Sequence, residues 1–547
     1  MSYLTLQTDT AIDITFDVIL SGATFEYSLD TINWSTIVIN TPIHVASVLY
    51  VRGVGNENLT GQLLHYTIPN DTSHHTWSGN VESLIDYTVV DGGNSPVLSY
   101  LCLYQLCKDD IGLINVDNLE FPTEVLSQAC YYEMFSGCSN LVSAHFALPS
   151  QTLAVGCYQG MFLNCSSLTI GPVALPALTL TPGCYCDMFS GTALTEAYDI
   201  PAEVLANQCC QRMYKNCTRL TVARIPTEVT SPWITAKEVY REMFMGCTSL
   251  VTPCALPATE IRSPADGAYR AMFKDCTALT TMPDLPATTI WTEAYYEMFS
   301  GCTSLVNTPN SIGDNAYSVG QYGFYRMFRG CTALKKAPNI GITTMIYAYA
   351  CYQMFSGCSS LKKAAKFDST INNIYQYGCY GMYTNCISLV EPPELPAATV
   401  MQYGYRYMFQ GCTSLKDLPD LPDPTLSNYC YNGMFYGCSS IKLSTAQTGE
   451  YQKPYRIPSG TATGTSATAA LTNMFTDTGG TFTGTPVINT TYYLAVEIPA
   501  SKPMYVGVNS KAREVTDMYV GVNSKARKVT AIYVGVNGKA REVYKST

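Results

Sequence analysis

One phrase, Tyr-x-x-Met-Phe-x-Gly-Cys-Thr/Ser-x-Leu, recurs along this chain of 547 residues. It is clearest at Tyr131–Leu141, Tyr240–Leu250, Tyr295–Leu305 and Tyr431–Ile441. Met-Phe or Met-Tyr pairs begin at Met134, Met161, Met188, Met213, Met243, Met272, Met298, Met327, Met354, Met382, Met408, Met434 and Met474. The steps between them are 25 to 30 residues, with one of 40. A period in this range predicts a solenoid, in which each supersecondary unit buries its apolar face only against its neighbours.

Each unit contains a backbone signal three residues after the Met, where only Gly, Asn or Asp occurs. These residue types tolerate positive φ, and a left-handed residue commonly ends a helix. We therefore expect a short helix that carries the Tyr and the Met on one face. Further along, Leu285-Pro286-Ala287 is typical of the segment before the next unit, and Thr288-Thr289-Ile290 would lead into the next helix. Because proline fixes φ and donates no ladder hydrogen bond, we expect it to mark the corner where a short strand ends.

These residues carry a family resemblance. Phe-x-Gly-Cys-x-x-Leu with a nearby proline resembles BspA-like leucine-rich repeats. The longer phrase Cys-Thr-Ser-Leu-x-x-x-Pro-x-Leu-Pro-Ala-Thr-Thr, nearly complete at Cys276–Thr289, Cys386–Thr399 and Cys412–Thr425, is similar to the variant in gut Bacteroides proteins and their tailed phages. The resemblance covers roughly Leu101 to Tyr493 and departs at Thr192 and around Met474. It implies a leucine-rich-repeat solenoid used for adhesion or recognition, without enzyme activity.

The chain divides into three expected parts, which together make an α/β repeat protein with β regions at both ends. Residues 1–90 lack the repeat, and alternating apolar and polar residues at Ile12–Val18 and Phe25–Leu29 predict strands of a β-sandwich. Residues 91–493 would form the solenoid with its caps. Residues 494–547 contain three copies of a 14-residue unit, each predicted to be a β-hairpin.

The C-terminal repeats are basic on an otherwise acidic protein of formal charge −10. Their expected turns are Asn509-Ser510, Asn523-Ser524 and Asn537-Gly538. The Tyr-Val-Gly-Val-Asn-Gly-Lys-Ala-Arg phrase resembles tags on virion proteins of gut phages. The repeats therefore have two interpretations, a solvated basic face or a docking tag for an acidic partner.

The 23 cysteines all lie between Cys102 and Cys438, mostly one per unit at a fixed place. Free cysteine packs as a small buried hydrophobe, so we expect a buried thiol ladder. Disulfides are the alternative, with Cys184/Cys186 and Cys209/Cys210 as the best candidates. Zinc is disfavoured, because no Cys-x-x-Cys pair exists and only five His occur.

The sequence predicts no catalytic, cofactor-binding or metal-ligating residue and no cofactor. It contains no nucleophile elbow, phosphate-binding glycine loop or zinc-helix motif, although carboxylates paired in space stay an open alternative. His74-His75 beside Asp71 is expected to be a surface pair, and Asp109-Asp110 to be equally ordinary. Tyrosines three residues before Met, such as Tyr158, Tyr269 and Tyr405, are expected in the core. Tyr317, Tyr347, Tyr375 and Tyr403 are instead candidates for an exposed surface.

Composition and chain ends then suggest a function. The acidic balance disfavours nucleic-acid binding, no apolar run is long enough for membrane insertion, and no signal peptide is visible at the N-terminus. We expect a phage virion structural protein, a head or tail fibre or surface decoration, located at the virion surface. The alternatives are a bacterial cell-surface adhesin and a carbohydrate-active enzyme on a repeat scaffold. The expected partners are other virion proteins and a host surface protein or glycan, and a homo-oligomer is left open.

Overall fold

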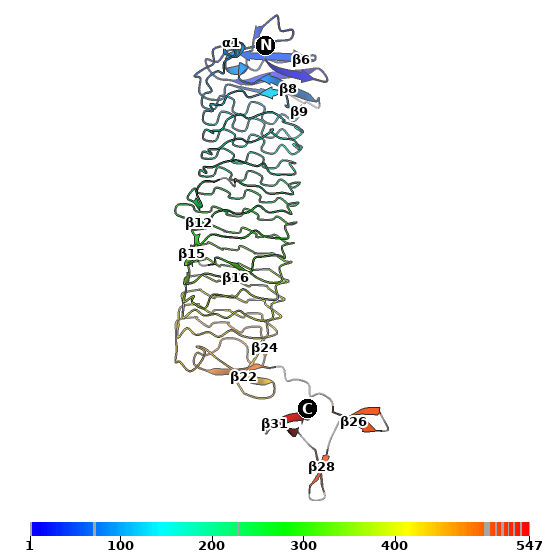
Figure 1. Cartoon of the computed structure of the whole chain (residues 1–547), viewed down its shortest axis with the longest axis vertical. Helices are drawn as coiled ribbons and strands as arrows, with labels where there is room; N and C mark the ends of the chain where they lie inside the picture. The colour runs from blue at the N-terminus through cyan, green and yellow to red at the C-terminus, as the bar shows by residue number, and fades with distance from the viewer. Residues whose placement is uncertain are drawn as a thin grey trace.

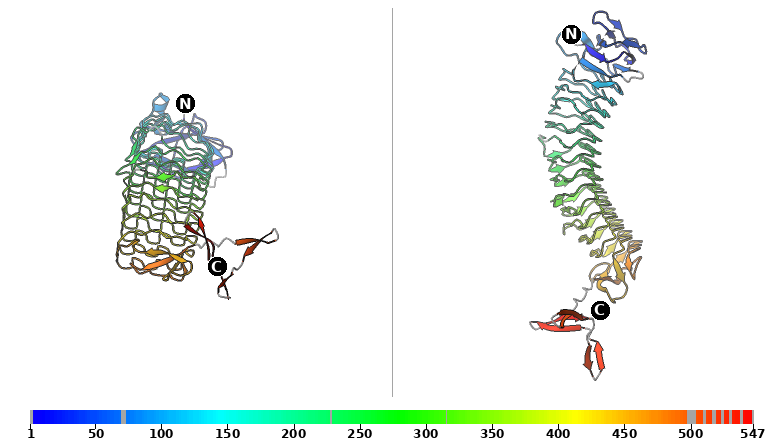
Figure 2. Two further views of the ribbon diagram at one scale, coloured as in Figure 1. Left: turned by 60° about the horizontal axis from the view of Figure 1, so that its bottom comes forward. Right: turned by 90° about the vertical axis from the view of Figure 1, so that its right-hand side faces the viewer.

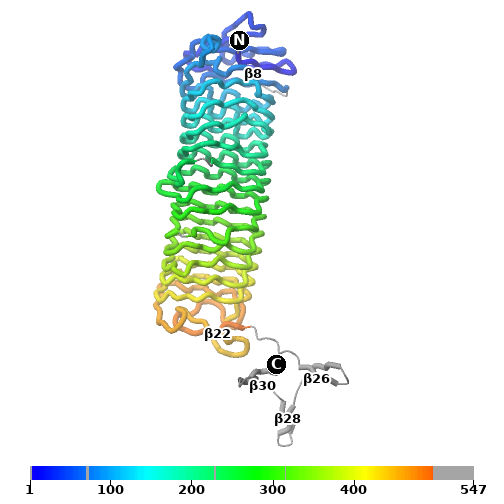
Figure 3. Tube along the Cα trace, viewed as in Figure 1, coloured from blue at the N-terminus to red at the C-terminus, as the bar shows by residue number. Residues whose placement is uncertain are grey.

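The computed structural model describes residues 3–68, 73–226, 229–314 and 316–496, and the backbone of strands between 504 and 545. The repeats stack as parallel rungs along the long axis, and the N-terminal sheets lie at one end of the stack (Figure 1). The rungs follow one another in chain order along the tube of Figure 3. Seen from the side, the stack is gently curved (Figure 2). This elongated shape is the one that the repeat period predicts.

The N-terminal region contains two sheets that share a core. The smaller sheet is antiparallel with the order β5-β2-β7, and the larger has the order β10-β8-β1-β6-β3-β4, with β9 also on β8. Tyr66 of β7 packs on Trp77 of β8 with ring centroids 5.5 Å apart. The expected alternation is present in β2, where Ile12, Ile14 and Phe16 are buried. The bounds are β1 Leu4–Thr8, β2 Ile12–Ile19, β3 Phe25–Ser28, β4 Ser35–Thr36, β5 Ile43–Val45, β6 Val48–Gly53, β7 Leu64–Thr67, β8 His75–Asn80, α1 Ser83–Asp91, β9 Leu113–Asn115 and β10 Leu119–Glu120.

Strand β8 joins this region to the repeats, because β9 and β10 pair with it in parallel. The same ladder continues from Asn115 to Ser143 and then to Ile170 through isolated bridges. At this junction the buried Asp110 carboxylate accepts a hydrogen bond from the Tyr66 hydroxyl at 2.5 Å and contacts Nε2 of His75 at 2.8 Å. The expectation of a surface His74-His75 pair is therefore wrong for His75, which is 1% exposed and fixed by packing between the two regions.

The expected short helix in each rung is wrong. Among the described residues the only helix is α1, and the segment around each Met is a chain of overlapping turns. In the rung of Met134, positive φ occurs at Ala129, Glu133 and Gly137, that is, at every fourth residue. Such residues prevent the i→i−4 bonds of a helix. Instead alternate N–H groups bond within the turn and to the next rung, as Met134 N does to Tyr131 O at 3.4 Å and Glu133 N to Gln159 O at 2.8 Å.

The two-residue strands lie after the proline corner, not before it as expected. Seven of them form one parallel sheet, in which each Thr-Ile-like pair bonds to the next rung. β-branched residues suit this ladder, whereas the preceding proline has no N–H to contribute. The sheet consists of β11 Trp233–Ile234, β12 Glu260–Ile261, β13 Thr289–Ile290, β15 Ser318–Val319, β17 Met345–Ile346, β18 Asn373–Ile374 and β19 Thr399–Val400. Elsewhere the rungs meet mainly through isolated bridges, and also through β14 Ser311–Ile312 and β16 Asn339–Ile340, which follow Pro309 and Pro338.

The core repeats from rung to rung as expected. Met134, Phe135 and their counterparts are fully buried, and Phe135 stacks on Phe162 with centroids 5.5 Å apart. Tyr158, Tyr269 and Tyr405 are buried, which confirms their assignment to the core. Because identical side chains meet in successive rungs, one packing solution serves the whole stack.

All 23 cysteines are buried and unpaired, which agrees with the buried thiol ladder and not with the disulfide alternative. In the fixed position after the turn, each thiol reaches a carbonyl of the preceding rung. Cys302 Sγ donates to Phe273 O at 3.0 Å, and Cys331 Sγ to Phe299 O at 3.1 Å. Thr192, the exception in sequence, instead donates to Phe189 O of its own rung at 2.9 Å.

The C-terminal end of the stack closes with β20 Thr425–Leu426 paired to β23 Thr465–Ser466, and with the sheet β22-β25-β21-β24. The divergent repeat of Met474 is the last rung, since Phe475 stacks on Phe435 with centroids 5.4 Å apart. The bounds are β21 Lys442–Ser444, β22 Tyr451–Arg456, β24 Gly479–Gly480 and β25 Thr491–Ala495.

The three C-terminal hairpins are antiparallel pairs, as the sequence predicts. Their expected turn residues at 509–510, 523–524 and 537–538 lie outside the described residues. The pairs are β26 Met504–Val508 with β27 Lys511–Val515, β28 Tyr519–Val522 with β29 Lys525–Lys528, and β30 Ala531–Val536 with β31 Lys539–Lys545.

Candidate functional site

Two columns of tyrosines run along the turn face of the C-terminal rungs. The first column occupies the position five residues before Met, and the second the position two residues before Met. In the first column consecutive ring centroids are 4.9, 4.7, 4.5 and 5.1 Å apart. In the second they are 4.6, 5.0 and 4.8 Å apart. The first column is Tyr322, Tyr349, Tyr377, Tyr403 and Tyr429, and the second is Tyr296, Tyr325, Tyr352 and Tyr380.

The backbone turns project these rings outward. Every first-column tyrosine has positive φ, between 58° and 63°. The tyrosines are half-buried, because each ring covers the faces of its neighbours. Burial raises the pKa of Tyr349, and it raises that of Tyr325 to about 12. These two phenol groups therefore stay protonated at neutral pH, and a phenol group both donates and accepts hydrogen bonds.

Arginines lie among these rings. The Arg326 guanidinium is 4.9 Å from the ring centroid of Tyr325, and Arg406 is 4.7 Å from that of Tyr407 and 5.4 Å from that of Tyr403. Cation–π contacts of this kind hold the charge against the rings, and Arg326 Nε also donates to Gln353 Oε1 at 2.9 Å. We call the two columns with Arg326 and Arg406 the tyrosine face.

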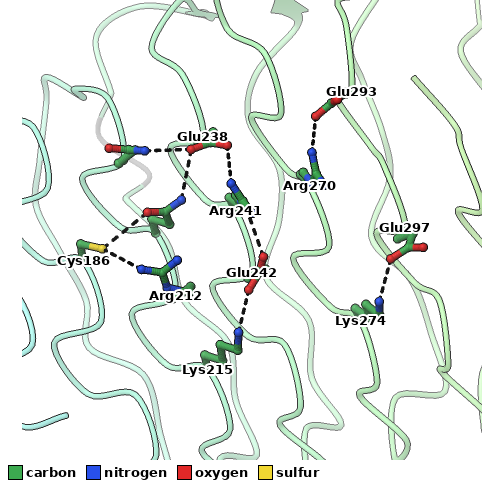
Figure 4. Close-up of polar contacts among 12 residues, drawn as sticks. Cys186, Arg212, Lys215, Glu238, Arg241, Glu242, Arg270, Lys274, Glu293 and Glu297 are labelled. Atoms are coloured by element: carbon green, nitrogen blue, oxygen red, sulfur yellow. Dashed lines mark hydrogen bonds and ion pairs between the residues drawn. The ribbon is translucent and has the colours of Figure 1, made fainter. Parts of the chain in front are cut away.

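The preceding rungs carry charged residues at the same two positions, Glu238 and Glu293 in the first and Arg241 and Arg270 in the second, with further charges beside them (Figure 4). Lys215 Nζ lies 2.8 Å from Glu242 Oε2, and Lys274 Nζ lies 2.7 Å from Glu297 Oε2. Burial alone would raise the pKa of Glu242, but Lys215 and Arg241 hold it below its ordinary value. These charged side chains pair with one another between neighbouring rungs. They therefore leave fewer free groups for a partner than the tyrosine face does.

The four tyrosines expected at the surface fall on two neighbouring faces. Tyr403 belongs to the tyrosine face. Tyr317, Tyr347 and Tyr375 lie along the two-residue strands, where Tyr317 is 63% and Tyr347 38% exposed and Tyr375 is half-buried against Tyr347. The sequence analysis did not predict the other tyrosines of the two columns. The available signal was tyrosine at the same offset from Met in successive repeats, at Tyr322, Tyr349, Tyr377, Tyr403 and Tyr429.

In the part of the chain that the structure describes, no group of three or more His, Cys, Asp or Glu is arranged to hold a metal ion. None of the described helices is long and apolar enough to cross a membrane.

Comparison with known proteins identifies the repeats. The family model for the BspA type leucine rich repeat region matches residues 237–383 and 328–451, with six copies. No curated protein matches the chain. A solved leucine-rich repeat protein from Bacteroides ovatus ATCC 8483 is 19% identical, with 60% of this chain and 85% of that one covered and a TM-score of 0.31.

A leucine rich cell surface protein from Faecalibacterium prausnitzii A2-165 is 16% identical, with 48% of this chain and 74% of that one covered and a TM-score of 0.26. The expectation of a virion protein stays a prediction.

Proposed function

Residues 237–451 are BspA-type leucine-rich repeats, and from this premise we propose that the chain is a non-enzymatic, adhesin-type recognition protein. It acts at a bacterial cell surface and binds a protein on another cell through the tyrosine face. The resemblance of the repeats to adhesion and recognition proteins supports the class of function. The stacked tyrosines and the arginines of the tyrosine face are the observation that supports this choice of binding surface.

The composition of that face favours a protein partner. Tyrosine and arginine dominate the energetics of protein interfaces, because they combine large rigid contact area with hydrogen bonding. The rings of each column are stacked on one another at 4.5 to 5.1 Å, so their broad faces are already covered. A sugar that needs a free ring face would find little here, whereas a protein surface can contact ring edges, hydroxyls and guanidinium groups.

The test removes the middle of the first column with the triple variant Tyr349→Gly, Tyr377→Gly and Tyr403→Gly. Glycine occupies the same position with positive φ at Gly156, Gly183 and Gly267, so the backbone accepts it. We expect binding of the full chain to intact target cells to fall on the order of tenfold or more, which corresponds to about 1.4 kcal/mol or more. Flow cytometry with labelled protein across a panel of gut bacterial and epithelial cells measures it.

The matched control is Glu238→Gly with Glu293→Gly, which empties the same column in the charged rungs. The control should bind as the parent chain does. Pretreatment of the cells with protease should lower binding of the parent chain to that of the triple variant. Equal binding by the triple variant and the parent chain, or a difference between them that survives protease and is lost after periodate oxidation of cell-surface sugars, would contradict the proposal.

A further inference from the structure

A gap interrupts the row of side chains beside the parallel sheet. The residues that directly follow strands β12, β13, β15, β17 and β18 form this edge column, namely Arg262, Trp291, Gly320, Tyr347 and Tyr375. Ile290 pairs with Val319, and Val319 with Ile346, so the residues that follow them occupy successive levels. Gly320 therefore leaves one level empty between the aromatic rings of Trp291 and Tyr347.

Glycine at position 320 is required by the approach of the backbone. A Cβ atom there would lie 2.8 Å from the backbone carbonyl carbon of Trp291 and 2.9 Å from the backbone nitrogen of Thr292. Real Cβ atoms do not come this close to backbone, so no other residue fits without a shift of the rung. The gap is thus built into the packing of two adjacent rungs.

The gap opens into a hollow of about 460 Å³ walled by Trp291, Tyr317 and Tyr347. Small-molecule sites have volumes of roughly 300–1,000 Å³ and combine aromatic walls with a few polar groups. Trp291 is 39% and Tyr347 38% exposed, so both rings remain accessible. Rungs lie about 4.8 Å apart, so the two walls are about 9.6 Å apart and leave room for one ring between them.

The polar side chains that line the hollow are uncharged and free to bond to a ligand. Thr292, Ser318 and Gln321 line the hollow, and within the described part of the chain their side chains make no hydrogen bond. No charged residue is among the lining residues. In neighbouring positions the carboxylates of Glu260 and Glu293 are paired with Arg262 and Arg270. The hollow therefore suits an uncharged ligand that has an apolar face and several hydroxyl groups.

We propose that this hollow, the Trp291–Tyr347 pocket, binds a neutral hexopyranose unit of a glycan. The C–H face of the sugar packs against the exposed rings, which attract the positive edge of C–H groups through their negative faces. Its hydroxyls bond to Thr292, Ser318 and Gln321, which both donate and accept. This site lies apart from the tyrosine face and goes beyond the proposed function, since it needs no protein partner.

The test titrates the full chain with maltoheptaose, cellohexaose and hexa-N-acetylchitohexaose, and with polygalacturonate as the charged comparison. Calorimetry measures binding, and tryptophan fluorescence reports the environment of Trp291. We expect at least one neutral oligosaccharide to bind, and Trp291→Ala and Tyr347→Ala each to weaken it on the order of tenfold. Tyr317→Ala is a second variant at a wall that is 63% exposed, so its effect on folding is small.

The matched control is Trp233→Ala. Trp233 is an exposed tryptophan on the same sheet, but the Arg262 guanidinium covers its ring at 3.6 Å. The control should leave sugar binding unchanged. Absence of binding by all three neutral sugars, preference for polygalacturonate, or equal loss in Trp233→Ala would overturn the proposal.

Discussion

At the scale of single residues, the recurring cysteine has a physical reason beyond its size. The Phe273 carbonyl accepts the Cys276 N–H of its own rung at 3.2 Å and the Cys302 thiol of the next rung at 3.0 Å. The thiol thus supplies a weak donor that spans one rung while it fills the core as a hydrophobe would. Serine would donate as well but would bury less apolar surface.

This arrangement predicts that the thiols are unreactive in the folded protein. Burial raises the pKa of Cys358 and of Cys438 to about 12, so the nucleophilic thiolate is scarce and also shielded. At about pH 8, where free cysteine reacts readily, we expect none of the 23 thiols to react with Ellman's reagent, and all to react in concentrated guanidinium chloride. Rapid native labelling of several thiols would show that they face solvent.

At the scale of the rung, left-handed turn residues follow a pattern between neighbours. Three residues after Met, an Asn or Asp is followed in the next rung by Gly. Asn216 precedes Gly246, and a Cβ on Gly246 would lie 2.3 Å from Asn216 Oδ1. The side chain of one rung therefore fills the space that the glycine of the next rung leaves. Tolerance of positive φ is necessary at this position, but it is not sufficient.

A pair of variants tests this pattern. Gly246→Asn should destabilise the protein by about 1–3 kcal/mol, because the new side chain collides with Asn216. Gly330→Asn should cost less than about 1 kcal/mol, because Asn tolerates the conformation. Gly330 has nearly the same φ, 74° against 76°, but its Cβ would meet only Gly301 N at 4.0 Å.

Urea unfolding followed by circular dichroism measures both variants. Similar losses for the two would mean that φ alone governs the position.

At the scale of the whole molecule, burial of many thiols and phenols couples stability to alkaline pH. The pKa of Cys217 is raised from 9.0 to about 11, and that of Cys102 from 9.0 to about 12, in both cases by burial. In the unfolded chain these groups lose their protons near their ordinary pKa, while the folded chain retains them. The folded state then binds more protons, so the free energy of unfolding falls as pH rises.

The expected loss begins near pH 9 and continues to about pH 12, and each such thiol contributes about 1.4 kcal/mol per pH unit between its two pKa values. Below pH 9 this contribution is fully present. The urea concentration at the midpoint of unfolding should decrease steeply from about pH 8 through about pH 9.5 to about pH 10.5. Tyrosinate absorbance should appear as the chain unfolds. A midpoint that stays constant to about pH 10.5 would contradict the buried ladder.

The sequence alone determined the repeat, its core and the fate of its cysteines. Those properties depend on the residues within one repeat, which recur often enough to identify the buried positions at Met134, Phe135 and Cys138. It also indicated the strands at the N-terminus and the C-terminal hairpins, because alternation and turn residues act locally.

Only the tertiary structure decided how one rung meets the next. Left-handed residues at every fourth position replace the expected helix with turns. These turns depend on hydrogen bonds from alternate N–H groups to the next rung, which the sequence of one repeat does not reveal. The tyrosine columns, the gap at Gly320 and the burial of His75 likewise need the register between segments. Repeats of 25 to 30 residues absorb their length differences in loops, so spacing along the chain does not fix that register. Hydrogen bonding and packing between rungs fix it instead.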